Sequence, residues 1–235
     1  MKQSKEISTG RKLWECLNPF FFIIIASFMA TLVVSAVLLI YGDMHGCSRL
    51  QIYNQIDSSS IWISTLMYLS FLIIKNRSIR FDKFKYQYQS AGWPVWKCIL
   101  ACIAAIVWGE LASYFIDLIQ LGKTFTGYEE ASQSAFGGQP IWLLLAVVVV
   151  LGPIAEELLF RRMILGRIKY YFGSRWAIVI SALLFGIYHG NMVQFVYAGL
   201  LGLGFGYIYD KSGNIRISIV AHMCLNLLAV LGSFL

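Results

Sequence analysis

Ionisable and amide side chains stand inside several apolar segments of this chain. Glu156 and Glu157 are adjacent in GPIAEELLFRRM, His189 follows FGIY, and His222 and Asn226 lie in AHMCLN. A charged side chain in a membrane core costs about 2.5–3.5 kcal/mol on insertion scales, so such groups usually face a cavity or a partner. A carboxylate and two imidazoles on three helices could activate water or hold a metal ion. These residues are therefore the first candidates for a buried site.

Helix geometry separates the two acidic residues. Arg161 lies four residues after Glu157, which is the favourable order for an ion pair on a helix. Such a pair is stronger when it is partly desolvated than it is in water. Glu156 is turned about 100° from Glu157 by the 3.6-residue period, so it can point into a different space. We therefore expect Glu157 to pair with Arg161 and Glu156 to be the free carboxylate.

The same spacing of four recurs at the other polar positions. Phe185 and His189 share one helix face, and so do His222 and Asn226. Each polar residue taken alone has a plainer explanation, because histidine and asparagine in membrane helices commonly hydrogen bond between helices. The two arginines after the acidic pair are likewise typical of cytoplasmic anchors. Their conjunction in the C-terminal part of the chain favours one shared site.

The composition indicates an integral membrane protein. Of the 235 residues, 58% are apolar and 13% are charged, and the mean hydropathy is +0.68. A water-soluble globule is hard to build from such a sequence. We predict an all-α fold, a polytopic transmembrane helix bundle with about seven spans of about 20 residues each. The spans are expected at roughly 19–41, 58–75, 93–119, 140–160, 174–190, 192–209 and 215–235.

The cations between these spans predict the orientation of the chain. They gather before the first span and after the second, fourth and sixth, whereas the alternate loops hold only Arg49 and Lys123. By the positive-inside rule the N-terminus is cytoplasmic and the C-terminus outside, in what we expect to be a bacterial plasma membrane. The net charge of +7 thus reflects topology. We expect the lipid bilayer, and no nucleic acid, as a partner.

Two further segments have structural interpretations. In AGLLGLGFG, Ala198, Gly202 and Gly206 recur every four residues and line one helix face. Small residues so spaced permit close contact between membrane helices. The segment 122–139 is the longest linker without a basic cluster, and we interpret it as a plain loop, with a short interfacial helix or a lid as alternatives.

Helix lengths raise one difficulty for a shared site. Counted at about 1.5 Å per residue from the expected cytoplasmic ends, Glu156 and His189 both lie about 21 Å deep. His222 lies only about 10 Å deep by the same count. Helix tilt or a displaced helix boundary must absorb the difference if the three are to meet.

The three motifs together resemble the CAAX prenyl protease and bacteriocin-processing family of intramembrane proteases, also called the CPBP or Abi family. Its pattern is Glu-Glu-x-x-x-Arg, then Phe-x-x-x-His, then His-x-x-x-Asn, on successive membrane helices. The corresponding sequences here are EELLFR, FGIYH and HMCLN. Order, spacing and helix placement all match. The resemblance covers roughly residues 140–232, and the first three spans carry no signature of the family.

The resemblance implies an intramembrane endopeptidase that cleaves a small peptide or a membrane-associated protein. Carried over by position, Glu156 would activate water with the help of His189. His222 and Asn226 would stabilise the oxyanion of the tetrahedral intermediate. The supporting residues of the site would be Glu157, Arg161 and Phe185.

The same resemblance divides one integral domain into two sequence regions. Residues 1–92 would hold an N-terminal cytoplasmic segment and two transmembrane helices. Residues 93–235 would form the catalytic transmembrane core, with the motifs at 156–226.

Cofactor use is left open by the resemblance, because family members have been described both as metalloproteases and as metal-free glutamate proteases. Glu156, His189 and His222 could ligate a zinc ion. However, no HExxH motif supplies a second carboxylate as base, so Glu157 would have to leave Arg161. We favour the metal-free alternative over zinc.

Two other functions fit parts of the sequence. A catalytically silent relative could act by binding, as a bacteriocin self-immunity protein or a membrane scaffold, but the intact motifs favour an enzyme. A small transporter could use Glu110, Asp117 and Glu156 as a proton path. No repeat of hydropathy supports a transporter.

Overall fold

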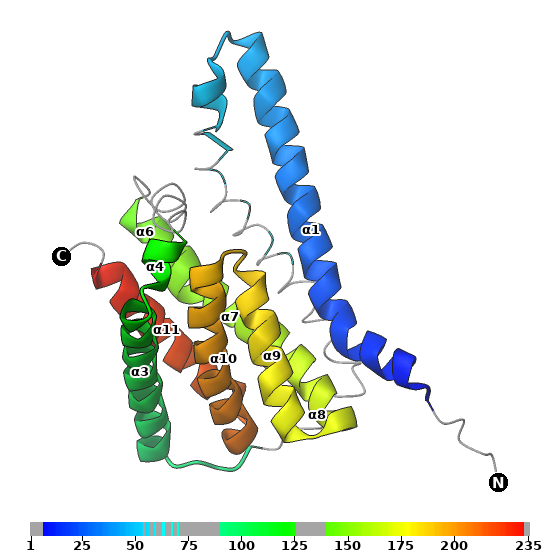
Figure 1. The fold of residues 1–235 in the computed structure, drawn as a ribbon, viewed down its shortest axis with the longest axis vertical. Coiled ribbons are helices and arrows are strands. Elements are labelled where there is room, and N and C mark those ends of the chain that lie inside the picture. The colour runs from blue at the N-terminus through cyan, green and yellow to red at the C-terminus, as the bar shows by residue number, and fades with distance from the viewer. Residues whose placement is uncertain are drawn as a thin grey trace.

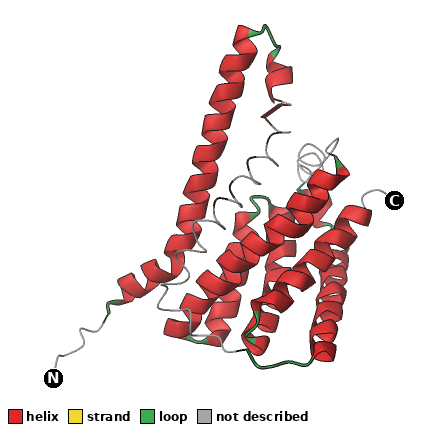
Figure 2. Cartoon of the chain, turned by 180° about the vertical axis from the view of Figure 1, so that it is seen from behind, coloured by secondary structure: helices red, strands yellow, loops and turns green. Residues whose placement is uncertain are grey.

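The computed structural model describes residues 7–53, 90–125 and 140–232, together with residues 55, 56, 59, 63, 67 and 70. Its regular elements are all helices, and Figure 2 shows only helices and loops in this part of the chain. The predicted all-α bundle is therefore confirmed. The predicted span at 58–75 and most of the linker at 122–139 lie outside the described residues.

From Ile141 onward the helices follow one another with short connections (Figure 1). One continuous helix, Ile141–Phe172, is built from alternating α-helical and π-helical stretches. The elements are α1 (Thr9–Met44), α3 (Val95–Leu118), α4 (Leu121–Thr124), α6 (Ile141–Leu144), η1 (Leu145–Leu151), α7 (Gly152–Glu157), η2 (Leu158–Leu165), α8 (Gly166–Phe172), α9 (Ser174–Tyr188), α10 (Met192–Ser212) and α11 (Ile215–Gly232).

Five of the described helices are long and apolar enough to cross a membrane: α1, α3, Ile141–Phe172, α10 and α11. The chain is thus an integral membrane protein. Helix α9 is apolar but has only 15 residues, so the expected span at 174–190 is shorter than predicted. The one-turn helix α4 occupies the start of the linker that we interpreted as a plain loop.

The predicted fourth span, 140–160, lies within a longer helix that continues to Phe172, close to the cytoplasmic end near Tyr170 from which the depth of Glu156 was counted. Arginines usually mark the end of a span. Here Arg161 is fully buried inside the helix and lies 3.1 Å from Glu157, so it does not stop the span.

Helices α9 and α10 pack closely through the predicted small-residue face. A Cβ atom at Gly202 would stand 2.9 Å from the Cα of Ala182, closer than real Cβ contacts come. At Gly206 it would stand 3.3 Å from Leu165. The structural interpretation of this face is confirmed, and it brings α10 against both α9 and the long helix.

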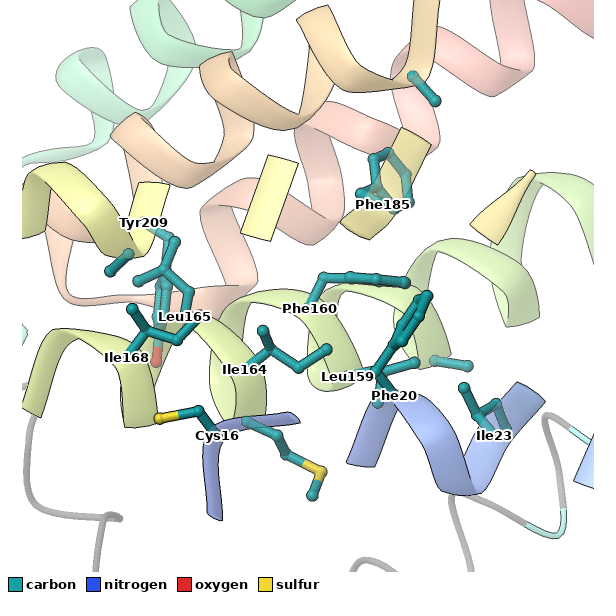
Figure 3. Packing of buried hydrophobic residues seen from close by; sticks show 14 residues of the cluster. Cys16, Phe20, Ile23, Leu159, Phe160, Ile164, Leu165, Ile168, Phe185 and Tyr209 are labelled. Atoms are coloured by element: carbon teal, nitrogen blue, oxygen red, sulfur yellow. The ribbon is translucent and has the colours of Figure 1, made fainter. Parts of the chain in front are cut away.

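The largest buried cluster lies on both sides of the long helix, with Phe20 of α1 on one side and Phe185 and Tyr209 on the other (Figure 3). Phe160 and Ile164 of η2 are fully buried there, and Phe160 lies edge-on to Phe185 of α9 with ring centroids 5.0 Å apart. The N-terminal part of α1 packs in this cluster through Phe20 and Ile23. Beyond Ile23, α1 leans away from the bundle in Figure 1.

A proline in α1 explains one of its contacts with the bundle. Pro19 has no N–H, so the carbonyl of Glu15, four residues earlier, loses its helical donor. Arg167 of α8 supplies a replacement, because its Nη1 donates to the Glu15 carbonyl at 2.8 Å. The same Nη1 donates to Asn18 Oδ1 at 3.2 Å. The start of α1 is thus tied to α8 at the place where the helix ladder is broken.

The substitution Arg167→Met tests this tie. It should lower the free energy of unfolding by about 1–3 kcal/mol, because the Glu15 carbonyl is left without a donor. In a Pro19→Ala background the loss should be smaller, because an alanine at that position donates its own N–H to Glu15. The free energy of unfolding is measured in detergent micelles for the unaltered protein, the two single variants and the double variant. The differences give the cost of Arg167→Met in each background. Equal costs in the two backgrounds would contradict the proposed replacement of the helical donor.

Candidate active site

The acidic pair lies between two π-helical stretches. A π turn bonds residue i to i+5, and its junctions with α-helix leave carbonyl groups available, often at functional sites. In η1 the carbonyl of Val148 accepts from Asn226 Nδ2 at 2.8 Å. In η2 the carbonyl of Phe160 accepts from Ser181 Oγ, also at 2.8 Å. Helices α11 and α9 are thereby tied to the long helix on either side of the acidic pair.

Glu157 is the centre of a buried ionic network. Glu157 and Arg161 are both 0% exposed, and Arg161 Nη2 lies 3.1 Å from Glu157 Oε1, so the predicted ion pair is confirmed. His222 Nδ1 lies 3.3 Å from the same carboxylate oxygen. Because a carboxylate accepts, Nδ1 is the donor in this contact. The guanidinium and the imidazole therefore both hold Glu157.

Glu156 faces the other nitrogen of the same imidazole. Its Oε2 lies 3.8 Å from His222 Nε2, and the residue is 9% exposed. The expectation that Glu156 would be a free carboxylate is wrong, because His222 stands between the two acids. The 3.8 Å separation is too long for a direct hydrogen bond.

His189 reaches the site beside Phe185. Its Nδ1 donates to the Phe185 carbonyl at 2.8 Å, which leaves Nε2 as the nitrogen that can accept a proton. The ring of His189 lies edge-on to Phe185 with centroids 4.9 Å apart. Phe185 in turn lies 5.9 Å from His222. The two imidazoles therefore lie on the same phenylalanine ring, which brings α9 and α11 together beside the long helix.

Residues 138–228 match a family model described as Type II CAAX prenyl endopeptidase Rce1-like. This part of the chain is thus similar to the CAAX prenyl endopeptidases. The resemblance drawn from the three motifs is confirmed, since all three fall within the matched residues. The chain is also 30% identical over 137 residues to "Putative membrane peptidase YdiL" of Bacillus subtilis (strain 168). No solved structure matches the chain.

The match to this relative covers 54% of the chain and 56% of the relative. The chain thus spans just over half the length of the curated relative it matches. The family match supports a membrane protease at the level of the family.

The family resemblance left open whether zinc binds, and the positions of the side-chain donors bear on this question. Among the described residues, no three His, Cys, Asp or Glu side chains come together as a metal-binding group. Glu156 and His222 face each other, and Nδ1 of His222 is directed at Glu157 and Nδ1 of His189 at a backbone carbonyl, which leaves Nε2 of each imidazole available as a ligand atom. As the described side chains lie, however, the three donors are not gathered into one metal-binding group.

Asn226 and the acids of α3 are placed differently from the other candidates. Asn226 is half-buried and donates to Val148, so one of its two amide hydrogens holds α11 against η1. Its predicted part in oxyanion stabilisation stays a prediction.

Glu110 and Asp117 are exposed on α3, whereas Glu156 is buried. The structure does not bring these three acids together, and the proton path of a transporter has no support.

Two residues of the site were missed in the sequence. Phe205 of α10 is 1% exposed and stacks on His222, with ring centroids 4.8 Å apart and planes 24° apart. Ser218 of α11 is fully buried on the same helix face as His222, and its hydroxyl donates to the Ile215 carbonyl at 3.0 Å. Ser218 precedes His222 by four residues, a spacing that could have revealed it. Phe205 lies in the segment AGLLGLGFG, whose small residues were interpreted as structural. A large aromatic residue between glycines was the one feature of the sequence that could have indicated its role.

The free energy of unfolding of variants that remove one or both charges tests the Glu157–Arg161 pair. Arg161→Met leaves an unpaired carboxylate in the bundle and should lower the free energy of unfolding by about 3–5 kcal/mol. Adding Glu157→Gln removes the uncompensated charge, so the double variant should be more stable than Arg161→Met alone. Chemical or thermal unfolding in micelles measures both. A double variant less stable than Arg161→Met would show that the two side chains act independently.

Proposed function

We propose that this protein is an intramembrane endopeptidase in which Glu156 is the general base. The observation that carries the proposal is that the nearly buried carboxylate of Glu156 faces Nε2 of His222. Nδ1 of the same ring contacts Glu157, which is paired with Arg161. A carboxylate held in this way can take a proton from water at a fixed position. The family match and the similarity to a named membrane peptidase support the reaction class.

In the first step, a water molecule beside Glu156 loses a proton to its carboxylate while the water oxygen bonds to the scissile carbonyl carbon. His189 Nε2 can accept a hydrogen bond from the same water, because Nδ1 is held by the Phe185 carbonyl. Two positioned acceptors orient the nucleophile, which lowers the entropic part of the barrier. A tetrahedral intermediate with one negatively charged oxygen results.

His222 is suited to stabilise this oxyanion. Its Nδ1 faces Glu157, so a second proton on Nε2 gives a donor on the side of Glu156. In that form the cluster is electrically balanced, with two carboxylates against Arg161 and the imidazolium. The C–N bond then breaks as Glu156 returns its proton to the leaving amine. We propose that Asn226 assists His222 through its second amide hydrogen.

The substrate is a small peptide or a membrane-associated protein that reaches the site from the bilayer. The apolar helices that surround the acidic pair support a substrate of this kind. We propose a bacterial plasma membrane as the location, with the N-terminus in the cytoplasm and the C-terminus outside. The distribution of Lys and Arg along the chain supports this orientation.

Substitution of the proposed base tests the function directly. Glu156→Gln preserves shape but cannot take a proton, and peptide cleavage should fall about 10²–10⁴-fold. Cleavage is measured in proteoliposomes with quenched fluorogenic peptides, some prenylated and some not. His189→Ala and His222→Ala should also lose activity. Glu110→Gln, which alters an exposed acid of α3, is the matched control and should retain activity.

The same variants separate catalysis from binding. If Glu156→Gln, His189→Ala and His222→Ala all keep full biological function at normal protein levels, the protein acts without catalysis. A self-immunity protein or a scaffold would then be the better description.

Metal removal tests the proposed metal-free reaction. Purified protein treated with a chelator and shown by elemental analysis to lack zinc should keep its cleavage rate, because Glu156 acts on water without a Lewis acid. Loss of the rate on chelation, with recovery on adding one equivalent of zinc, would refute the metal-free mechanism. An untreated sample carried through the same dialysis controls for inactivation.

A further inference from the structure

His222 needs a fixed ring plane if it is to serve two acids at once. Its two nitrogens face different carboxylates, Nδ1 toward Glu157 at 3.3 Å and Nε2 toward Glu156 at 3.8 Å. A rotation about the Cβ–Cγ bond would turn these edges away from both. Neither contact is short, so hydrogen bonding alone holds the ring loosely. Some other contact must define the plane.

Phe205 provides that contact. Its ring lies nearly parallel to the imidazole, with centroids 4.8 Å apart and 24° between the planes. Phe185 approaches the same imidazole edge-on, with centroids 5.9 Å apart and 89° between the planes. Parallel and edge-on contacts of this kind are the favoured aromatic geometries. One phenylalanine therefore covers a face of His222, and the other limits its rotation.

Phe205 also borders the cation of the network. Arg161 Cζ lies 5.6 Å from the Phe205 ring centroid and 4.6 Å from that of Phe185. A cation within about 6 Å of a ring face is attracted to it, more so where water is excluded. Phe205 thus touches both groups that hold Glu157.

The ring of Phe205 is itself held in place by its helix. It is 1% exposed and packs in a cluster with Ala221 and Leu225, which flank His222 on α11. Helix α10 is fixed on one side by the close contact of Gly202 with Ala182, and on the other by Trp108, whose Nε1 donates to the Leu200 carbonyl at 2.7 Å. The position of the ring is therefore determined by contacts outside the acidic network.

We propose that Phe205 is a positioning residue that fixes the plane of His222, so that Nε2 is aimed at the space beside Glu156. This role rests on the proposed function. It gives helix α10, which contains none of the three motifs, a part in the chemistry. In this role Phe205 acts through the imidazole that it stacks on.

The kinetic test compares two substitutions at this position. Phe205→Leu keeps an apolar side chain but removes the flat face, and Phe205→Tyr keeps the face. With the fluorogenic peptide that the unaltered protein cleaves best, Phe205→Leu should lower kcat about 10–100-fold with KM little changed, because the reacting groups are misplaced after binding. Phe205→Tyr should recover most of kcat. Phe20→Leu, the same change at a buried ring on α1, is the control and should keep kcat.

A spectroscopic test does not depend on cleavage. The chain has three histidines, so ¹⁵N-histidine NMR in micelles gives three pairs of ring-nitrogen signals, which single histidine substitutions assign. In the unaltered protein His222 should show one dominant pair of signals, with Nδ1 protonated and a ring-current shift from Phe205. Phe205→Leu should remove the shift and give more than one set of His222 signals, whereas Phe20→Leu should leave the His222 signals unchanged.

The results separate this inference from the proposed function. If the unaltered protein cleaves no peptide, the proposed function fails, while the NMR comparison still tests the positioning of His222. If Phe205→Leu folds and keeps both kcat and the His222 spectrum, Phe205 is only a packing residue and the inference is overturned. If Phe205→Leu does not fold, an NMR spectrum of Phe205→Tyr unlike that of the unaltered protein overturns it as well.

Discussion

The interaction on which the rest of the site depends is the buried ion pair between Glu157 and Arg161. Both side chains are 0% exposed inside an apolar bundle, where an unpaired charge would be strongly unfavourable. Their pairing leaves no uncompensated charge at this place in the long helix. It also gives Nδ1 of His222 a fixed acceptor. The orientation of His222, and through it the environment of Glu156, follows from this one pair.

The surrounding bundle can be understood as the support for that arrangement. The π-helical stretches on both sides of the acidic pair offer carbonyls to Ser181 and Asn226, which tie α9 and α11 to the long helix. Small residues on α10 bring it close enough for Phe205 to stack on His222. Each contact joins a different helix to the site. A site built across helices in this way is held by packing as much as by hydrogen bonds.

The sequence predicted those features that depend on local spacing. Glu157 and Arg161 are four residues apart, so helix geometry alone indicated their pairing, and the three polar helices could be selected because charged groups are rare in membrane spans. Features that depend on tertiary contacts could not be predicted. Glu156, for example, is not a free carboxylate, because His222 lies between the two acids. Phe205 was overlooked because its role follows from ring geometry, which a stripe of small residues does not indicate.

Our account of the reaction requires a water molecule to be activated beside Glu156 and the resulting oxyanion to be bound by His222. A structure with a peptide aldehyde bound as its hydrate, which mimics the tetrahedral intermediate, measures both contacts at once. We expect one oxygen of the hydrate within about 2.6–3.2 Å of the Glu156 carboxylate and the other within the same distance of His222 Nε2. A hydrate bound away from both side chains, or one bridged to them by a metal ion, would contradict the mechanism.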